Sequence, residues 1–560
     1  MKRFNLFNMI HKGLRASLYE CALTLQQTYF ADAEEASEAI QKIREAVLLF
    51  EKHGNHEDYI VMPPIKHVAV VMVEAFENEH LQDHALGNKL LHLINIFTDT
   101  KRDEERIIAG SALTKAFNDF MIFNLEHMAK EETLINNLDL SVNQVNRVHT
   151  AFPLIIGTGI TVSLKEEKFD INDIDILGRS LPSPTQSSVI SEHATTMATL
   201  IGGNGNSFVK GLGAAPAVRL TSSNYQNLSP DLISQLQALK VSVQNHSYGT
   251  GIENYYGIEA AEYDQQIYST DTLTHVFSSG NSGTLTPSTG VYGGVTRYAN
   301  LTGTFKQAKN VLVVGATNNE NLAEERSSAG PAYDGRIKPD LVTAGEDGTS
   351  GAAALTSGVV SLLQQDFKIK TGVQPSSALI KSILVNSAED LGSPFPDFKY
   401  GFGKLNAYQA IQTIIENRFN AGSTSSGQEV SYPLKVPLPN ADVKVTLTWN
   451  DPPASLNSPG ALINDLDLWV EDPAGNHILP WVLSTYPQVD SLSKPAVRFR
   501  DSLNNVEQVT LPLALPGDYK IHVPGHRVTS ATQPFYISYQ VREADQFEWT
   551  YPLSGDRLFA

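Results

Sequence analysis

Three polar residues have the types and the settings that nucleophilic catalysis requires. Ser350 opens "GTSGAAALTSG", where small residues would let another backbone approach closely and a helix start would favour developing negative charge. His193 opens the helical segment "SEHATTMATLIGG", and Asn281 follows the strand-like "THVFSS". A serine nucleophile needs a base and donors for an oxyanion, which imidazole and amide groups supply. Taken alone, the Ser350 segment is more typical of an ordinary capped helix, so its partners must decide.

The order and spacing of these motifs resemble the subtilisin-like serine proteases. His193 and Asn281 are 88 residues apart, Asn281 and Ser350 are 69 residues apart, and "SSAGPAYDGRIKPDLVTAG" resembles the family's stretch ahead of the serine. The resemblance covers about residues 157–419. It implies that Ser350 is the nucleophile, that His193 moves the proton and that Asn281 donates to the oxyanion.

The segment "VQNHSYGTG" resembles the substrate-binding edge strand of the same family. The resemblance implies that Ser247, Tyr248 and Gly249 bind a peptide substrate as an added strand.

The acid that orients the histidine is where the chain departs from the family pattern. The family has an aspartate at the end of its first core strand, and in "GTGITVSLKEEKFDINDIDILGR" that position falls on Glu166. A glutamate would hold the imidazole as an aspartate does, because both accept from the ring N–H. Two other registers stay open: one makes Asp170 the acid, and the other places Gly157 at the position and leaves no acid.

A second set of candidate ligands lies in residues 1–137, which show the 3.6-residue periodicity of helices. "HGNHE" and "HLQDH" each place two ligands four residues apart, and "HMAKEE" places a histidine ahead of two glutamates. Side chains four residues apart share a helix face, so four such helices would direct their ligands into one core. Imidazole and carboxylate together suit iron, and a carboxylate would bridge two ions. The expected ligands are His11, His53, Glu57, His80, His84, His127 and Glu131.

This order of ligands resembles the hemerythrin-like cation-binding domains, over about residues 1–137, and "FNDFMIFNLEHMAKEE" is similar to the family's last helix. The resemblance implies a di-iron centre that binds oxygen or a small anion. Glu132 satisfies a variant of the motif as well as Glu131, which we favour. A mononuclear or zinc site that uses some of these ligands is the alternative, and His56 and His67 do not fit the pattern.

The composition describes a globular protein of several domains. The chain has 560 residues, of which 41% are hydrophobic and 18% charged. Its net charge of −19 argues against a general nucleic-acid binder, which needs clustered Lys and Arg. The single cysteine, Cys21, excludes an intrachain disulfide and a cysteine-based metal cluster. No run reaches the ~18 apolar residues of a membrane helix, and no export signal is visible at the basic start.

The pattern of apolar and polar residues predicts three structural regions. Apolar strands alternate with helical segments between residues 150 and 419, which predicts an α/β domain with a parallel sheet. Alternation at Val443, Val445, Leu447 and Trp449 predicts an antiparallel β-sandwich or jelly roll. The expected parts are a four-helix bundle at 1–137, a junction at 138–156, a subtilisin-like peptidase domain at 157–419, a Gly/Ser-rich linker at 420–429, a β-sandwich at 430–545 and a tail at 546–560.

Two acidic stretches of the last region, "ALINDLDLWVED" and "RDSLNNVEQVTL", resemble loops of a β-domain appended to some subtilisin-like proteases. The resemblance implies a calcium site, for which carboxylate and amide oxygens are suitable ligands. The alternative is a solvated loop with Asn and Asp turns. The expected ligands are Asp465, Asp467, Asp501, Asn505 and Glu507.

The expected function is a serine endopeptidase that acts on polypeptides, joined to an iron-binding domain. The alternative is a catalytically inactive protease fold that serves as a binding module beside an iron or oxygen sensor. Neither a nucleic-acid partner nor a membrane span is expected. The first resemblance suggests export and the second suggests the cytoplasm, so the location and the natural origin of the fusion stay open.

Overall fold

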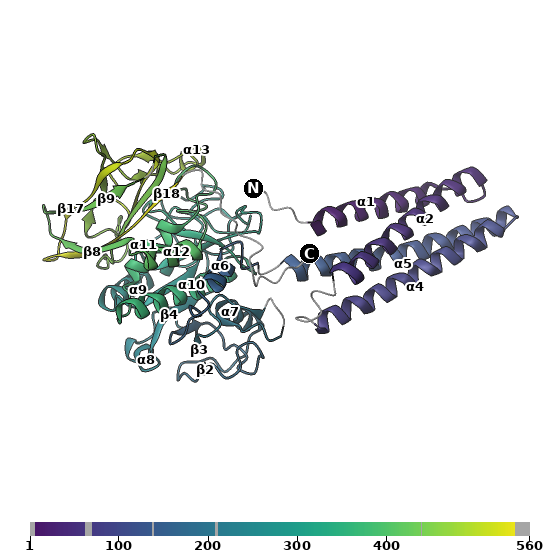
Figure 1. Cartoon of the computed structure of the whole chain (residues 1–560), viewed down its shortest axis with the longest axis horizontal. Helices are drawn as coiled ribbons and strands as arrows, with labels where there is room; N and C mark the ends of the chain where they lie inside the picture. The colour runs from purple at the N-terminus through teal and green to yellow at the C-terminus, as the bar shows by residue number, and fades with distance from the viewer. Residues whose placement is uncertain (1–5, 62–69, 137–138, 208–210, 438, 544–560) are drawn as a thin grey trace. The chain divides into compact units, whose positions relative to one another are not determined.

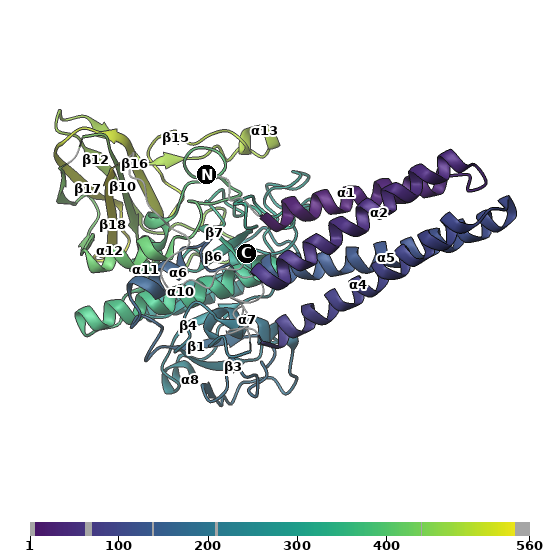
Figure 2. The ribbon, with the colours of Figure 1, turned by 45° about the vertical axis from the view of Figure 1, so that its right-hand side comes forward.

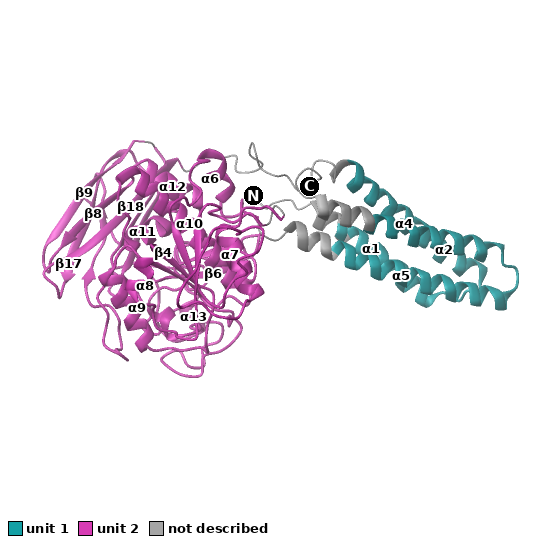
Figure 3. Ribbon diagram, turned by 90° about the horizontal axis from the view of Figure 1, so that it is seen from below, with its two compact units in different colours: residues 1–137, 557–560 teal, residues 138–556 magenta. Residues whose placement is uncertain are grey.

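The computed structural model describes residues 6–61, 70–136, 139–207, 211–437 and 439–543. The chain divides into two compact units, residues 1–137 with 557–560 and residues 138–556 (Figure 3). Among the described residues, no helix is long and apolar enough to cross a membrane.

Long amphipathic helices build the first unit, as the periodicity of the N-terminal region predicts (Figure 1). They are α1 (Leu6–Gln27), α2 (Ala33–His56), α4 (Val70–Asp99) and α5 (Asp103–Asn136), and a short π-helical segment, η1 (Glu57–Val61), continues α2. Asp32 begins α2 as its N-cap, because its carboxylate accepts the backbone N–H groups of Glu34 and Glu35. Apolar side chains from these helices, Ile43 and Phe117 among them, meet in one buried core.

A parallel sheet lies at the centre of the second unit, in the strand order β2-β3-β1-β4-β5-β6-β7. The strands are β1 (Thr161–Lys165), β2 (Ser180–Leu181), β3 (Arg219–Ser223), β4 (Val241–His246), β5 (Thr274–Ser278), β6 (Leu312–Thr317) and β7 (Leu341–Ala344). Helix α10 (Gly348–Thr371) is buried from Gly348 to Phe367 and packs against the sheet and α7 (Glu192–Gly202). The prediction of a central α/β domain with a parallel sheet is confirmed.

The shorter helices of this region are α6 (Val145–Ala151), α8 (Ile233–Ala238), α9 (Ile258–Ser269), η3 (Thr304–Gln307), α11 (Ser377–Ser387) and α12 (Ala407–Ile415). Helix α6 lies in the segment that was expected to be a junction. Its residues Val145 and Val148 are buried in the core of the α/β region. The side chain of Asn143 donates to the carbonyl oxygen of Ala344 at 2.7 Å and accepts the N–H of Ala344 at 3.1 Å. The described part of the junction therefore belongs to the α/β region.

Antiparallel sheets form the C-terminal part, as the alternating pattern predicts (Figure 2). One sheet has the order β16-β10-β18-β8, a second has the order β11-β17-β12-β13 with β9 also paired to β17, and β14 pairs with β15. The elements are β8 (Phe419–Thr424), β9 (Glu429–Val436), β10 (Ala441–Thr448), β11 (Asp465–Leu466), β12 (Trp469–Glu471), β13 (His477–Ile478), β14 (Trp481–Val482), α13 (Val489–Leu492), β15 (Val497–Arg498), β16 (Val506–Ala514), β17 (Gly517–Arg527) and β18 (Gln533–Glu543).

The Gly/Ser-rich segment at 420–429 is not a linker, and that prediction is wrong. Half of it, residues 420–424, belongs to β8, which pairs with β18 in a register that joins Ala421 to Tyr536 and Thr424 to Gln533. Small residues suit this strand because a Cβ on Gly422 would lie 2.2 Å from the hydroxyl oxygen of Tyr432.

Candidate active site and candidate metal site

The candidate catalytic residues of the second unit lie where its parallel strands end. Glu166 directly follows β1, Asn281 follows β5, and Ser350 opens α10 after β7. His193 is the second residue of α7, whose N-cap Ser191 accepts the N–H of Ala194. The carboxyl ends of parallel strands share one edge of the sheet, so residues from distant parts of the sequence meet there.

Glu166 and His193 are joined by a hydrogen bond between Oε1 and Nδ1. The backbone N–H of Glu166 donates to the carbonyl oxygen of Ser223 at 2.7 Å, and the Glu166 side chain is only 8% exposed. This hydrogen bond raises the pKa of His193, against the effect of burial. A carboxylate only accepts, so Nδ1 carries the hydrogen and Nε2 is the nitrogen left for a substrate or nucleophile.

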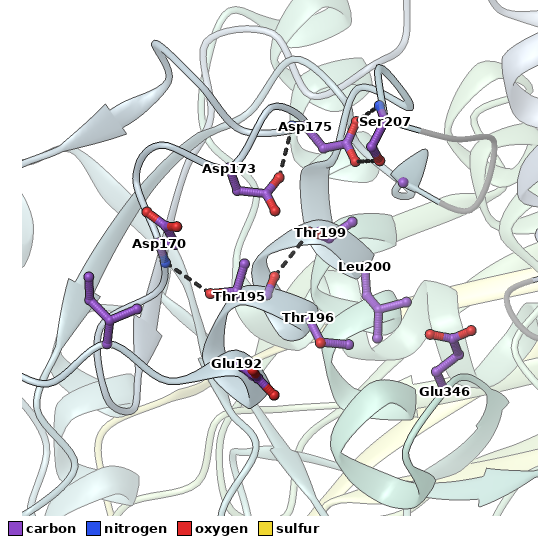
Figure 4. A pocket seen from close by; sticks show the side chains of 12 residues that line it. Asp170, Asp173, Asp175, Glu192, Thr195, Thr196, Thr199, Leu200, Ser207 and Glu346 are labelled. Carbon is purple, nitrogen blue, oxygen red and sulfur yellow. Dashed lines mark hydrogen bonds between the residues drawn. The ribbon is translucent and has the colours of Figure 1, made fainter. Parts of the chain in front are cut away.

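Among the described residues, no hydrogen bond or ion pair joins Asp170, the other candidate acid, to His193. Its carboxylate accepts the N–H of Asn172, and its own N–H donates to Thr195, both at 2.9 Å. Figure 4 shows Asp170 beside Thr195 in the wall of a pocket of about 600 Å³. This pocket is acidic, and neither His193 nor Ser350 lines it. Its other labelled acidic residues are Asp173, Asp175, Glu192 and Glu346.

Ser350 lies against the segment that was predicted to bind substrate. Its Oγ donates to the carbonyl oxygen of Ser247 at 3.3 Å, and the Ser247 hydroxyl donates to the carbonyl oxygen of Ser350 at 2.9 Å. Ser247, Tyr248 and Gly249 follow β4, and Gly249 is exposed. Among the described residues, no hydrogen bond joins Ser350 to His193. The Nε2 atom of His193 instead lies 3.5 Å from Oδ2 of Asp347.

Asn281 is oriented by the residue before Ser350. Its Oδ1 accepts both the backbone N–H and the hydroxyl of Thr349, at 3.2 and 2.9 Å. Because a backbone N–H only donates, the contact assigns oxygen to this side of the amide and leaves the NH2 group on the other side. Asn281 is exposed, so this NH2 group is able to donate to a substrate oxyanion.

Two histidine and carboxylate groups come together in the first unit and share Glu57. The ligand atoms of His11, His53 and Glu57 lie within 4.8 Å of one another, and so do those of Glu57, His80 and His127. Oε1 of Glu57 lies 3.3 Å from Nε2 of His53 and 4.0 Å from Nε2 of His11. Its Oε2 lies 3.1 Å from Nε2 of His80. A carboxylate with one oxygen toward each group has the form of a ligand that bridges two ions.

Two of these histidines are hydrogen-bonded through Nδ1 to a further carboxylate. Nδ1 of His80 bonds to Oδ1 of Asp58 at 2.6 Å, and Nδ1 of His127 bonds to Oε2 of Glu79 at 2.7 Å. Burial lowers the pKa of His80, but the hydrogen bonds from Glu57 and Asp58 outweigh it and raise the pKa to about 9. Such partners fix the ring orientation of histidines that bind metal.

Two other predicted ligands do not appear in these groups. His84 lies one helical turn after His80 on α4 and belongs to neither group. Glu131 and Glu132 lie within α5, but their side chains are outside the described residues.

The acidic residues predicted to bind calcium have protein partners in the C-terminal part. Asp465 and Asp467 both pair with Arg500, at 2.6 and 2.8 Å, and Glu507 accepts the N–H of Leu468 at 2.7 Å. Within the described part of this region, no group of three carboxylate or imidazole ligands closes around one point. The calcium site therefore stays a prediction.

Asp501 and Asn505 also have partners of their own. Asp501 accepts the backbone N–H of Leu503 at 2.9 Å and that of Asn504 at 3.1 Å. Burial raises the pKa of Asp501 to about 6. The amide of Asn505 donates to Asn310, at 3.1 Å, across to the α/β region.

Several residues at both sites were not found from the sequence. Asp347 precedes Ser350 by three residues, which signals that it lies near the nucleophile, but its contact with His193 comes only from the fold. Asp58 and Glu79 each stand next to a predicted ligand in the chain. Their contacts join different helices or turns, which residue spacing alone does not reveal.

The central region of the chain is similar to a known family. Residues 157–403 match the family model described as the subtilase family. Two curated relatives are serine protease/ABC transporter B family proteins of Dictyostelium discoideum. The protein tagA is 26% identical over 272 residues, which are 38% of this chain and 15% of that protein. The protein tagD is 22% identical over 322 residues, which are 41% of this chain and 18% of that protein. The matched regions thus span less than a fifth of these relatives.

Solved structures of maturation proteases are also similar to part of this chain. The patellamide maturation protease PatA is 21% identical and covers 46% of this chain and 98% of its own, with a TM-score of 0.37. The prenylagaramide maturation protease PagA is 22% identical and covers 48% and 98%, with a TM-score of 0.38. The family match supports a subtilase domain over residues 157–403.

Proposed function

We propose that the chain is a serine endopeptidase in which Ser350, His193 and Glu166 form the catalytic triad. The observation that carries this proposal is the hydrogen bond that fixes His193 to Glu166 at the sheet edge where Ser350 opens α10. The subtilase match over residues 157–403 supports the same chemistry.

Binding of a peptide along residues 247–249 would prepare the nucleophile. The Ser350 hydroxyl would turn away from the Ser247 carbonyl, and the Asp347 carboxylate would give up its place near His193. Hydrogen bonds of catalytic groups commonly tighten only when substrate is bound.

The reaction then follows from the roles of the side chains. His193 Nε2 takes the hydroxyl proton as Ser350 Oγ attacks the peptide carbonyl, and Glu166 stabilises the imidazolium through Nδ1. The Asn281 NH2 group and the backbone N–H of Ser350 donate to the oxyanion. His193 gives the proton to the leaving amine, and an attacking water releases the acyl group by the same steps.

Fluorophosphonate labelling and casein hydrolysis by the full chain test this proposal. We expect Ser350 to be labelled and casein to be cleaved, and Ser350→Ala to abolish both. Glu166→Gln should reduce turnover by about 10⁴-fold, as loss of the orienting carboxylate does in another serine protease. Asp170→Asn is the matched control and should be mild. A folded chain that neither labels nor cleaves would instead favour the inactive binding module.

We also propose that the first unit is a hemerythrin-like bundle that binds a pair of iron ions. The observation that favours it is the position of Glu57, with one carboxylate oxygen toward His53 and the other toward His80. Imidazole and carboxylate donors without cysteine fit iron. His11 and His53 would hold one ion, His80 and His127 the other, and Glu57 both. Bound there, iron would supply an open position for oxygen or a small anion.

Metal analysis of the full chain after anaerobic iron loading tests this second function. We expect about two iron ions per chain, because one shared carboxylate can bind two ions. Glu57→Gln should lose most of the iron, because it removes the shared ligand. Glu51→Gln, an exposed position on α2, should not. Less than one metal per chain in the unmodified protein would contradict a di-iron site.

A further inference from the structure

The carboxylate of Asp347 lies between the candidate general base and an arginine. Its Oδ2 is 3.5 Å from Nε2 of His193, and its Oδ1 is 3.7 Å from Nη1 of Arg326. Both separations are longer than the roughly 3 Å of a hydrogen bond from nitrogen to oxygen. The Asp347 side chain is 49% exposed, which leaves it room to approach either partner. The two contacts therefore define two alternative positions for one negative charge.

Asp347 occupies the N-cap position of α10 but does not cap that helix. An N-cap aspartate usually accepts an N–H of the first helical turn through its side chain. Asp347 instead has φ 61° and ψ 43°, in the left-handed region, and its side chain makes no capping hydrogen bond. A residue with a Cβ adopts this region at a cost. Helix capping thus does not explain the carboxylate, which is left to act on His193 and Arg326.

Arg326 is held beside the turn that leads to the nucleophile. Its Nε donates to Oε2 of Glu324 at 2.9 Å, which fixes one edge of the guanidinium. A Cβ added to Gly348 would lie 2.8 Å from this Nε and 2.9 Å from Oδ1 of Asn281. Gly348 has φ 64°, a conformation that also favours glycine. The guanidinium therefore packs directly against the backbone that follows Asp347.

The two partners of Asp347 differ in how permanent their charge is. A guanidinium stays charged at every pH at which proteins are folded, and it presents five N–H donors. Nε of Arg326 serves Glu324, and a different nitrogen, Nη1, faces Asp347. The imidazole of His193, in contrast, gains and loses its charge with pH and during proton transfer.

Competition for the carboxylate follows from this difference. The charges of Glu166 and Asp347 both favour the imidazolium form of His193 and raise its pKa. An imidazolium carries a hydrogen on Nε2 that Asp347 would accept, whereas a neutral imidazole with its hydrogen on Nδ1 offers none there. The more firmly Arg326 holds the carboxylate, the less Asp347 favours the protonated base.

We propose that Arg326 is a positioning residue of this peptidase, which draws the Asp347 carboxylate away from Nε2 of His193 and so leaves that nitrogen for Ser350. The inference rests on the endopeptidase function proposed above. In this role Arg326 acts through Asp347 and makes no bond to the substrate.

The dependence of kcat/KM on pH, for one peptide without ionisable side chains, tests this role on the full chain. Arg326→Gln removes the charge that competes for Asp347, so the carboxylate should stay at His193 and favour its imidazolium form. We expect the acid limb to move to higher pH by about half a unit, which lowers kcat/KM on the limb by about threefold, as loss of an exposed ion pair would. Arg326→Lys keeps a positive charge and should move the limb less.

A double variant shows whether the effect passes through Asp347. In the Asp347→Asn background, Arg326→Gln should move the limb little, because the carboxylate on which Arg326 acts is absent. Arg297→Gln is the matched control, since it removes an arginine that forms an exposed pair with Glu325 at 3.1 Å. This control should leave the limb in place.

Modification by diethyl pyrocarbonate reports on His193 without the peptidase reaction. The reagent acylates neutral imidazole, and mass spectrometry distinguishes His193 from the other histidines of the chain. The His193 side chain is 34% exposed, so the reagent is able to reach it. The pH midpoint of its modification should rise in Arg326→Gln by the same amount as the acid limb.

The outcomes separate this inference from the function on which it rests. An acid limb and a modification midpoint that do not move in Arg326→Gln overturn the role of Arg326. A shift that is equally large in the Asp347→Asn background also overturns it, because Arg326 would then act by another route. If the unmodified protein cleaves no peptide and Ser350 is not labelled, the proposed function fails and the positioning role fails with it, even where the midpoint of His193 moves.

Discussion

His193 lies between two carboxylates, and this placement governs how its activity should depend on pH. Glu166 bonds to Nδ1, and Asp347 faces Nε2 at 3.5 Å while lying 3.7 Å from Nη1 of Arg326. The hydrogen bond to Glu166, and then the charges of Glu166 and Asp347, raise the pKa of His193. A protonated imidazole cannot take the proton of Ser350. Activity should therefore be lost as the pH falls through the raised pKa of His193.

Asp347→Asn should move the acid limb of kcat/KM to lower pH. The change removes one of the two negative charges that favour the imidazolium form, so His193 becomes neutral at lower pH. The measurement is kcat/KM for one neutral peptide across the pH range. Asp170→Asn removes a carboxylate that does not touch His193 and should leave the limb in place. A limb that is identical in Asp347→Asn and the unmodified protein would show that Asp347 does not act on His193.

Part of the candidate active site could be predicted from the sequence, because the order of the motifs places Glu166, His193 and Asn281 relative to Ser350. One feature could not. The contact between Asp347 and His193 joins the starts of two helices, and nothing in either local sequence specifies it.

At the scale of elements, the start of α10 shows why glycine follows the nucleophile. A Cβ on Gly351 would lie 1.5 Å from the carbonyl oxygen of Glu346, so the turn closes only around a residue with no side chain. The sequence predicted close approach here, and the packing supplies the reason. The incorrect prediction of a linker at 420–429 has a different origin. Small residues suggest a linker, but the partner strand β18 begins more than 100 residues later and converts them to β8.

Gly351→Ala should separate the nucleophile from its partners. The clash with Glu346 forces the turn to move, and a displacement of about 1 Å costs about 10²-fold in rate. The measurement is the rate at which a fluorophosphonate labels Ser350, together with the melting temperature. Gly13→Ala is the matched control on α1, where a Cβ meets nothing within 4 Å. There the change should be neutral or stabilise by up to about 1 kcal/mol. Unimpaired labelling in Gly351→Ala would mean that the turn is not tight.

For the whole molecule, the division into units is the feature that residue patterns predicted least. The sequence changes from an α/β pattern to one in which apolar and polar residues alternate, which suggests separate domains. Both regions nevertheless belong to one compact unit. Buried polar contacts join them: Lys309 of the α/β region donates to Asp451, and Asn310 donates to the carbonyl oxygen of Asp451 at 2.8 Å. The partners are 142 residues apart, so no local pattern reveals them.

Asp451→Asn should therefore destabilise the second unit as a whole. Both side chains of the Lys309–Asp451 pair are completely buried, and removing one charge leaves the other without compensation in a dry interior. Breaking such a pair costs about 3–5 kcal/mol, which calorimetry would record as a melting transition lowered by several degrees. Glu325→Gln breaks the exposed pair with Arg297 and should cost about 1 kcal/mol or less. Because the two regions belong to one compact unit, Ser350 labelling should be lost over the same temperature range as the β-sheet signal. Labelling that outlasts that signal would mean that the α/β region is stable without the C-terminal sheets.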